Sequence, residues 1–261
     1  MCANYRIYPS LLDSFQRYLD SAKEFEDVWN VDADGEYKRS LEEIEAEREQ
    51  DLLDSINRVP RPASEAQDKG TAFNELIDWE ARRTPTREGL YFYNRNCQNG
   101  FKTYEVKFNG WEWVFNGRDI DRWAPCYASA VPQYLCKATI DTKRGPVLLY
   151  GYADEICQDV VVDLKTTTRY NFGKFEHGWQ KSVYPYCLVA SGDMPSVSRF
   201  EYHVYVWREK KGDPISVDRY VETYDYDHEK NTAKLRAFVE TFCDWLEDHR
   251  DKITDKKIFG L

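Results

Sequence analysis

Residues 151–186, GYADEICQDVVVDLKTTTRYNFGKFEHGWQKSVYPY, contain the pattern that decides the fold. The spacing predicts two strands, at 147–156 and 160–165, joined by a turn at Gln158-Asp159. The second strand is continuously apolar until Asp163, as expected for a strand in the middle of a sheet. Residues 178–190 then predict a helix. A buried strand followed by a helix is typical of a sheet flanked by helices.

Charged residues interrupt both strands near their ends. Asp154 lies at the end of the first strand, and Asp163 and Lys165 lie at the end of the second. Strand side chains alternate, so Asp163 and Lys165 face one side and Leu164 faces the other. The two carboxylates and the Leu164 carbonyl are the oxygen ligands that Mg²⁺ and Mn²⁺ prefer. With Lys165 to hold an attacking water, the pattern predicts metal-dependent hydrolysis of a phosphodiester.

The predicted helix adds Gln180 and Tyr184, which are four residues apart and share one face. Gln180 can bond a phosphate or a metal-bound water, and Tyr184 can stack on a base or contact phosphate. The alternative for Tyr184 is a half-buried packing role. Trp179 and Phe172 are candidates for stacking on an unpaired strand, with core packing as their alternative. Phosphate contacts are expected from a set of basic and hydroxyl residues, namely Thr166, Arg169, Lys174 and Lys181.

The rest of the chain alternates between helical and strand patterns. Helices are expected at 9–29, 37–57, 69–82 and 228–250, and strands at 101–108, 111–115, 134–141, 199–208 and 215–224. Residues 120–132 give no clear pattern. The order predicts an α/β fold (mixed α+β) in a single domain of 261 residues. Its helical elaboration would span residues 1–83, and its sheet core would span residues 84–261.

Composition limits the classes of function. The net charge of −10 disfavours a general nucleic-acid coat protein, although the segment after Asp163 is locally basic. No apolar run is long enough to cross a membrane, and the N-terminus lacks a secretory signal, so we expect a soluble cytoplasmic protein. The seven cysteines are widely spaced without a CxxC pair, which disfavours disulfides and zinc. Three of them lie in apolar runs and are expected in the core: Cys136, Cys157 and Cys187.

These motifs together resemble the PD-(D/E)xK nuclease superfamily, most closely the RecB-type nuclease domain, and are similar to phage and CRISPR-adaptation exonucleases. The resemblance rests on GYADEI, VVDLKTT and QKSVY, ending at Tyr184. GTAFNELI (residues 70–77) resembles the upstream helix motif of the family, and PSLLDSFQRYL (residues 9–19) resembles its N-terminal helix. The matching pieces span about residues 9–190.

The resemblance implies a restriction-endonuclease-like core and a role for each matching residue. Asp154 and Asp163 would bind Mg²⁺ or Mn²⁺, Lys165 would be catalytic, and Gln180 and Tyr184 would support DNA binding and catalysis. Asn74 stands where the family has a metal-binding histidine, which makes it a weaker third ligand. Some relatives hold an iron–sulfur cluster with one early and several late cysteines. Here Cys2 is early but only Cys243 follows Cys187, so we expect no cluster.

The function implied is hydrolysis of DNA phosphodiesters by an exonuclease in recombination, repair or phage replication, with DNA and a recombination or replication protein as partners. A non-enzymatic DNA-binding or assembly module is the first alternative, favoured by Asn74 and the net acidity. A restriction-type endonuclease is the second, and a protein whose carboxylates have no catalytic role is the third. Family members differ in polarity, strand preference, DNA or RNA substrate and oligomeric state, so these stay open.

Overall fold

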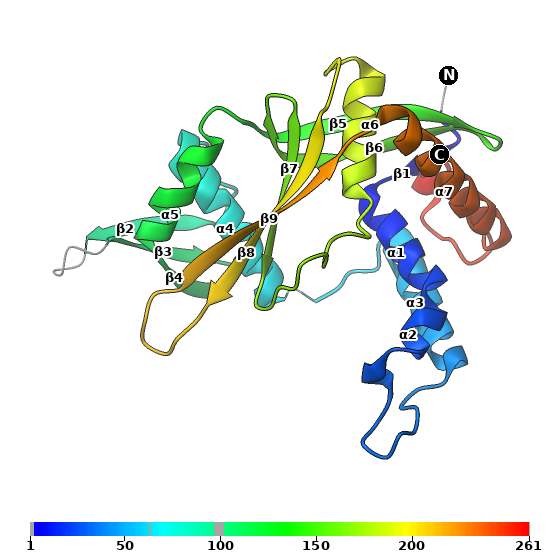
Figure 1. Cartoon of the computed structure of the whole chain (residues 1–261), viewed down its shortest axis with the longest axis horizontal. Helices are drawn as coiled ribbons and strands as arrows, with labels where there is room; N and C mark the ends of the chain where they lie inside the picture. Colours follow the sequence, from blue (N-terminus) through cyan, green and yellow to red (C-terminus); the bar gives the residue numbers. More distant parts are fainter. Residues whose placement is uncertain (1–2, 63, 97–101, 261) are drawn as a thin grey trace.

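The computed structural model describes residues 3–62, 64–96 and 102–260. Within them, a mixed sheet of six strands forms the centre (Figure 1). Its strands are β1 (Tyr5–Ile7), β5 (Val131–Thr142), β6 (Gly145–Cys157), β7 (Val160–Thr167), β8 (Arg199–Arg208) and β9 (Ser216–Asp225). The order is β1-β6-β7-β8-β9, with β5 also paired to β6. The β1–β6 and β7–β8 pairs are parallel and the others antiparallel, so the predicted mixed sheet is confirmed.

Each face of this sheet has its own hydrophobic core. The first core contains residues of four helices: α1 (Pro9–Leu19), α3 (Leu41–Ile56), α6 (Gln180–Ser191) and α7 (His228–Asp248). The second core contains residues of α4 (Glu65–Arg82), α5 (Gly117–Trp123) and a small antiparallel sheet of β2 (Tyr91–Asn96), β3 (Lys102–Phe108) and β4 (Trp111–Asn116). In β7, Val161 belongs to the first core and Val160, Val162 and Leu164 to the second. This alternation buries β7 on both sides, as its apolar sequence predicts.

Local capping sets the ends of several helices. Ser40 and Glu43 form a reciprocal capping box at the start of α3, and Ser64 accepts the Gln67 amide at the start of α4. Gly192, with a φ of 81°, ends α6 in the left-handed conformation that glycine adopts without strain. Both β1 and α4, from the first 83 residues, contact the main sheet, so this part of the chain contributes to the same cores.

Several predicted boundaries are wrong. The single helix expected at 9–29 ends at Leu19, and a short helix, α2 (Ser21–Phe25), follows the turn at Asp20. The helix expected from residue 37 begins only after its cap at Ser40. The unread stretch 120–132 contains the end of α5, a 3-10 turn and the start of β5. β1 and β2 were not predicted, because β1 is too short to show a period and β2 lies in a polar stretch. Phe101, expected in a strand, lies outside the described residues.

The cysteines expected in the core are confirmed there. Cys136 and Cys187 are buried, and Cys157 is half-buried; all three are free thiols. Cys2, considered above as an early cluster ligand, lies outside the described residues. Among the helices that the structure describes, none is both long and apolar enough to cross a membrane.

Candidate functional site

Asp154 lies at an irregular point of β6. Gln133 is the residue of β5 opposite it, but the β5–β6 pairing skips Gln133, whose backbone is left-handed with a φ of 48°. In a regular strand, Ala153 and Glu155 would face the same side of the sheet. Here Ala153 packs in the first core, whereas Glu155 bonds to Arg82 of α4 on the side of the second core. Strand irregularities of this kind commonly redirect a side chain near a site. Here the irregularity places Asp154 at the margin between the two cores.

Residues expected to be catalytic meet within β6 and β7, just beyond Glu155 and Val162, the last residue pair of their hairpin. The Leu164 amide donates to Asp154 Oδ2 at 2.8 Å, which joins the two strands at this point. Lys165 Nζ lies 2.6 Å from Asp163 Oδ2, so both side chains share one face, as alternation predicts. Gln180 Nε2 donates to Asp163 Oδ1 at 2.7 Å, and its Oε1 accepts from Lys165 Nζ at 2.7 Å. We call Asp154, Asp163, Lys165, Gln180 and Tyr184 the acidic cluster.

The electrostatics of the acidic cluster come from burial and from like charge. Burial first, and then the neighbouring Asp163 carboxylate, raise the pKa of Asp154 from 3.8 to about 7. Burial alone would lower the pKa of Lys165, but the Asp163 and Asp154 carboxylates outweigh it and hold that pKa above its ordinary value. Lys165 is therefore an ammonium at neutral pH. Without a cation, the site holds more negative charge than this one ammonium balances once Asp154 ionises.

The Tyr184 side chain packs beside Gln180 and against β6. Its hydroxyl lies 3.5 Å from Gln180 Nε2, and its side chain is buried. Burial, followed by the charge of Asp163, raises the pKa of this hydroxyl, so it stays protonated and can only donate or accept a hydrogen bond. A Cβ built on Gly151 would lie 2.8 Å from the Tyr184 ring, so β6 needs a glycine where the ring crosses it. Tyr184 therefore has both expected roles: its ring packs against β6, and its hydroxyl lies near Gln180.

A pocket of about 390 Å³ opens beside Asp154, between α4 and the start of β5. Asn74 of α4, Gln133 and Asp154 all line it. The Oδ1 atom of Asn74 is buried and has no hydrogen-bond partner. Glu75, the next residue, instead accepts the Arg87 amide at 3.0 Å and pairs with the Arg87 guanidinium. The residue in the histidine position of the family motif therefore reaches the same cavity as the first predicted metal ligand.

Two residues of the site were not found from the sequence. Gln133 Nε2 donates to Asp154 Oδ1 at 3.1 Å. Asp13 of α1 accepts the Trp179 amide at 2.7 Å and so fixes the start of α6, which carries Gln180. Burial raises the pKa of Asp13, and the Trp179 amide and the charge of Lys165 oppose that rise. For Asp13, the only available signal was an acid that follows Leu11 and Leu12 at the start of the first predicted helix.

The residues expected to contact phosphate lie apart from one another. Thr166 faces α4, since a Cβ on Gly70 would lie 2.6 Å from its Oγ1. Arg169 is exposed, while Lys174 Nζ donates to Thr167 Oγ1 at 2.7 Å. Lys181 is turned back onto the Glu176 carbonyl. Of this set, Arg169 and Lys174 are exposed to solvent, and Thr166 and Lys181 are half-buried.

The two aromatic candidates for stacking differ in their exposure to solvent. Trp179 is 5% exposed and stacks on Phe238 at a ring distance of 4.0 Å, which places it in the core. Phe172 is 87% exposed, so of the two it is the one free to stack on a ligand. The core alternative therefore holds for Trp179.

The donor set at the acidic cluster can be tested against a divalent cation. In the described part of the chain, no group of three or more His, Cys, Asp or Glu side chains is arranged to hold a metal. The cluster offers two carboxylates and, across the pocket, the unpaired amide oxygen of Asn74. These are hard oxygen donors, and a magnesium site usually needs only one or two protein carboxylates. The donor types match those that Mg²⁺ or Mn²⁺ prefers, and a cation would lower the raised pKa of Asp154.

Comparisons with known proteins give little for this chain. No protein-family model matches it, and no curated protein matches it. Among solved structures it is similar to one described as "Crystal structure of SSO0001", with a TM-score of 0.30 and 12% identity. The similarity covers 46% of this chain and 54% of that one, so the chain spans about half the length of that protein. A likeness this weak carries no argument, and the site is interpreted from its own geometry.

Proposed function

We propose that the protein is a metal-dependent deoxyribonuclease with a PD-(D/E)xK-like core, acting as an exonuclease. The observation that carries the proposal is a triad of Asp163, Lys165 and Gln180, joined by contacts of 2.6–2.7 Å. Beside it, Asp154 accepts the Leu164 amide at 2.8 Å and lines a pocket that Asn74 also lines. Strand β7 carries the Asp-Leu-Lys triplet, and α6 packs beside it with Gln180 at its first residue.

The side chains divide the work of hydrolysis. Asp154 and Asp163 would hold Mg²⁺ or Mn²⁺ with the Leu164 carbonyl and Asn74, and the bound cation supplies a water of lowered pKa and charge on the phosphate. Lys165, already an ammonium, faces the same side as Asp163 and neutralises charge that develops on the phosphate oxygens. Gln180 holds Asp163 and Lys165 in place through its two amide atoms. Substrate would compete with Asp163 and Gln180 for the Lys165 ammonium.

A second groove suggests the path of the substrate strand. It has a volume of about 660 Å³ and lies along α1, between the end of α3 and the start of α4. Arg17, Arg58 and Arg61 line it together with Asp13, whose charge also acts on Lys165. Arginines suit backbone phosphates, which favours a strand that enters along α1 and reaches the acidic cluster. Mutation of these arginines is expected to weaken binding more at low salt than at high salt, because each lost phosphate contact also reduces the salt dependence of binding.

The test is a cleavage assay on two DNA forms. End-labelled linear DNA and a closed circle are incubated with Mn²⁺, Mg²⁺ or EDTA, beside Lys165→Ala and the control Lys230→Ala, an exposed lysine of α7. We expect metal-dependent loss of linear DNA that Lys165→Ala abolishes. Cleavage of the circle would instead show a restriction-type endonuclease. Equal rates for wild type and Lys165→Ala would refute the assignment of the site.

Asn74 provides a second test, of metal binding rather than cleavage. Because its free Oδ1 is buried at the pocket that Asp154 lines, Asn74→His should tighten Mn²⁺ binding measured by calorimetry or by electron paramagnetic resonance. The matched control is Asn57→His, which lies away from the site and bonds to the Thr254 amide. No change for Asn74→His would place this residue outside the ligand shell.

An inactive binding or assembly module is the second candidate. It is favoured by Lys165 being fully occupied by Asp163 and Gln180, and by an amide at position 74. DNA binding that persists in EDTA, with no cleavage in any metal, would support this candidate over the nuclease.

A further inference from the structure

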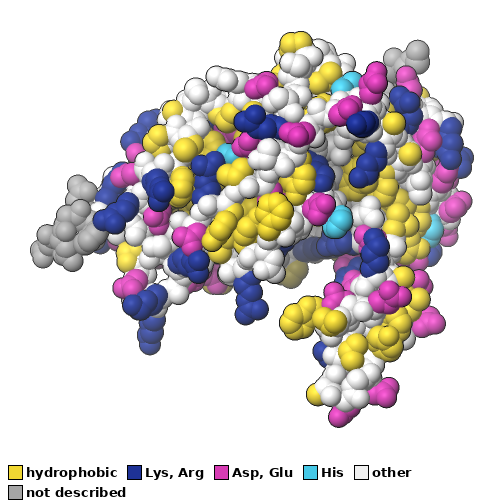
Figure 2. Space-filling view, viewed as in Figure 1, with side chains coloured by type: hydrophobic (Ala, Val, Ile, Leu, Met, Phe, Trp, Pro, Cys, Tyr) yellow, Lys and Arg dark blue, Asp and Glu magenta, His cyan; other side chains and the backbone are white. Residues whose placement is uncertain are grey.

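The helical projection formed by α1, α2 and α3 ends in a segment that lies far from the sheet, at the bottom of Figure 1. We call residues 26–37 the tip. Val28 and Trp29 form a 3-10 turn here and are 77% and 82% exposed, and Tyr37 is 55% exposed. In Figure 2 the same projection, at the lower right, carries hydrophobic and acidic side chains side by side. A large apolar side chain left this open needs an explanation, because its burial would be favourable.

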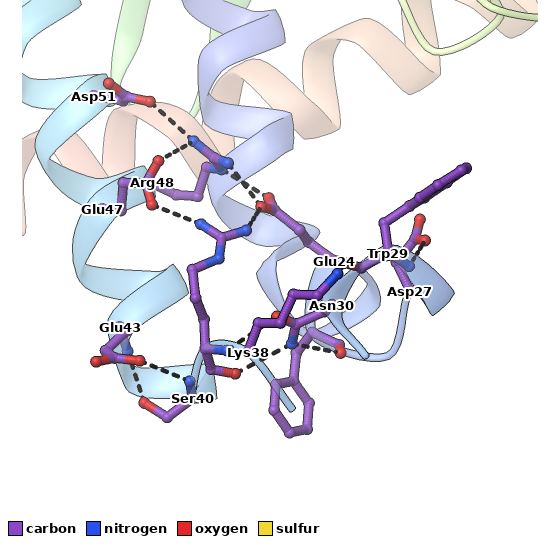
Figure 3. Close-up of polar contacts among 12 residues, drawn as sticks. Glu24, Asp27, Trp29, Asn30, Lys38, Ser40, Glu43, Glu47, Arg48 and Asp51 are labelled. Carbon is purple, nitrogen blue, oxygen red and sulfur yellow. Dashed lines mark hydrogen bonds and ion pairs between the residues drawn. The ribbon is translucent and has the colours of Figure 1, made fainter. Parts of the chain in front are cut away.

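The tip is held in one conformation by its own hydrogen bonds (Figure 3). Asn30, which is buried, donates to the Phe25 and Arg39 carbonyls at 3.1 Å each and accepts the Arg39 amide at 3.2 Å. A β-bridge joins Val31 to Tyr37 across the loop. The tip is therefore closed at its base by a buried amide and is not a loose loop.

Ion pairs join the residues on either side of the tip, Glu24 and Arg39, to α3. Arg48 makes two bonds of 2.7 Å to the Glu24 carboxylate, and Arg39 bridges Glu24 and Glu47 at 2.7 Å each (Figure 3). The Arg48 guanidinium, against some opposing burial and with help from Arg39, lowers the pKa of Glu24 to about 2, so this network stays charged at all physiological pH values. A network of several ion pairs orders side chains better than an isolated surface pair does.

The backbone of Trp29 is held on both sides. Asp27 accepts its amide at 2.9 Å, and Lys38 Nζ donates to its carbonyl at 2.8 Å. The indole itself points away from these contacts in Figure 3. An aromatic side chain on a fixed backbone loses little conformational entropy when it binds, so a preorganised residue of this kind can contribute more to affinity.

The charge around Trp29 identifies the kind of partner. Residues 26–37 contain no Lys or Arg, and all of their acids are exposed: Glu26, Asp27, Asp32, Asp34 and Glu36. Lys38 Nζ, which donates to the Trp29 carbonyl, is one cation beside these five acids, so the surface repels phosphates and disfavours stacking of Trp29 on nucleic acid. It complements a positively charged protein surface, and complementary charge favours the encounter of the right partner.

We propose that the tip is a docking element for another protein, with Trp29 inserted into an apolar pocket that is rimmed by Lys and Arg. The inference does not rest on the proposed nuclease activity, because none of its residues belongs to the acidic cluster. Val28 extends the apolar contact, and Asp34 and Glu36 face the basic rim. The occupant is distinguished from nucleic acid by its apolar pocket, and from a second copy of this chain by its excess of positive charge.

The experiment uses the full chain and a defined probe, a fluorescent amphipathic helical peptide built from leucine and lysine. Two alanines in its leucine face leave an apolar pocket, rimmed by lysines, that can receive the indole. We expect binding by fluorescence anisotropy that Trp29→Ala weakens by about tenfold or more, as for an interface anchor. Asp34→Asn with Glu36→Gln should weaken it at low salt and less at high salt. Tyr91→Ala, an exposed aromatic elsewhere, and Glu42→Gln with Glu45→Gln, exposed acids outside the tip, are the matched controls. Peptide binding that is equal in wild type and Trp29→Ala would overturn the proposal.

Two further measurements exclude the other occupants. A single-stranded oligonucleotide whose binding depends on Trp29 would overturn the proposal in favour of nucleic acid. Self-association in analytical ultracentrifugation that Trp29→Ala removes would overturn it in favour of a second copy. Trp29→Ala should leave cleavage of naked DNA unchanged, so failure of the docking proposal and failure of the nuclease proposal give different results.

Discussion

Replacing Asp154 by asparagine should stabilise the metal-free protein above neutral pH. The folded protein raises the pKa of Asp154 to about 7, whereas the ordinary value for an exposed aspartate is 3.8. A difference of about three units, at about 1.4 kcal/mol each, sets an upper bound of about 4 kcal/mol for the cost of ionising this carboxyl in the fold. Because Asp154 lines an open pocket, solvent screens part of this cost, and we expect about 2 kcal/mol.

The sign of the pH dependence follows from the two ionisations. Below about pH 4 the carboxyl is protonated in both the folded and the unfolded chain, so it does not change stability. As pH rises through about 4 to 7, only the unfolded chain loses this proton, and the free energy of unfolding falls. Above about pH 7 the whole cost is present and stays constant. Asp154→Asn should therefore gain most at about pH 8 and little at about pH 4.5.

The assay is urea unfolding in EDTA at these two pH values, with Asp159→Asn, in the exposed turn after β6, as the control. Mn²⁺ should stabilise the wild type and not Asp154→Asn, because only the wild type gains free energy from the bound ion. The reasoning would be refuted if Asp154→Asn were equally stable relative to wild type at both pH values, or less stable at the higher one. Either outcome would mean that burial and Asp163 do not penalise the charged carboxyl.

Arg82→Met should lower the free energy of unfolding by about 3 kcal/mol, because it leaves the buried Glu155 without its 2.6 Å partner. The control is Arg83→Met, an exposed neighbour, which should change the free energy of unfolding by less than about 0.5 kcal/mol. Chemical denaturation compares the two variants. Gly70→Ala should destabilise by about 1–3 kcal/mol, because the new Cβ would lie 2.6 Å from Thr166 Oγ1, and Thr166→Ala should restore most of that loss. A Gly70→Ala protein as stable as wild type would show that Thr166 can move aside.

Much of the sheet could be predicted from the sequence. The strand at 160–165 is apolar because both of its faces are covered, and this pattern was readable without a structure. Short elements were not readable. β1 has three residues and is held by its parallel pairing with residues 147–149, which is information carried by β6 and not by β1. The single helix predicted at 9–29 is divided at Asp20, since apolar periodicity does not show where the backbone turns.

The candidate site also contains some residues that the sequence predicts and others that it does not. Asp163, Lys165, Gln180 and Tyr184 lie on elements whose faces the sequence periods predict, and the structure brings them together. Asp13 could not be predicted, because it reaches the site through the packing of α1 against α6. The same holds for Gln133, whose position depends on a left-handed backbone in an irregular strand pair. Apolar periodicity in a sequence does not show which distant elements pack together, or where a single residue adopts an unusual backbone conformation.

The antiparallel hairpin of β6 and β7 has a consequence for folding. Its turn, at Gln158 and Asp159, is local in the chain, so Asp154 and Asp163 meet at an early and inexpensive loop closure. Gln180 joins Asp163 when α6, the crossover helix between β7 and β8, packs on the sheet, which is a later step than closing the hairpin. The two carboxylates are thus brought together before the amide partner of Asp163 is in place. Divalent cations should speed the completion of folding by relieving that repulsion, so the ion would assist the last step of folding at the same residues where it is proposed to serve catalysis.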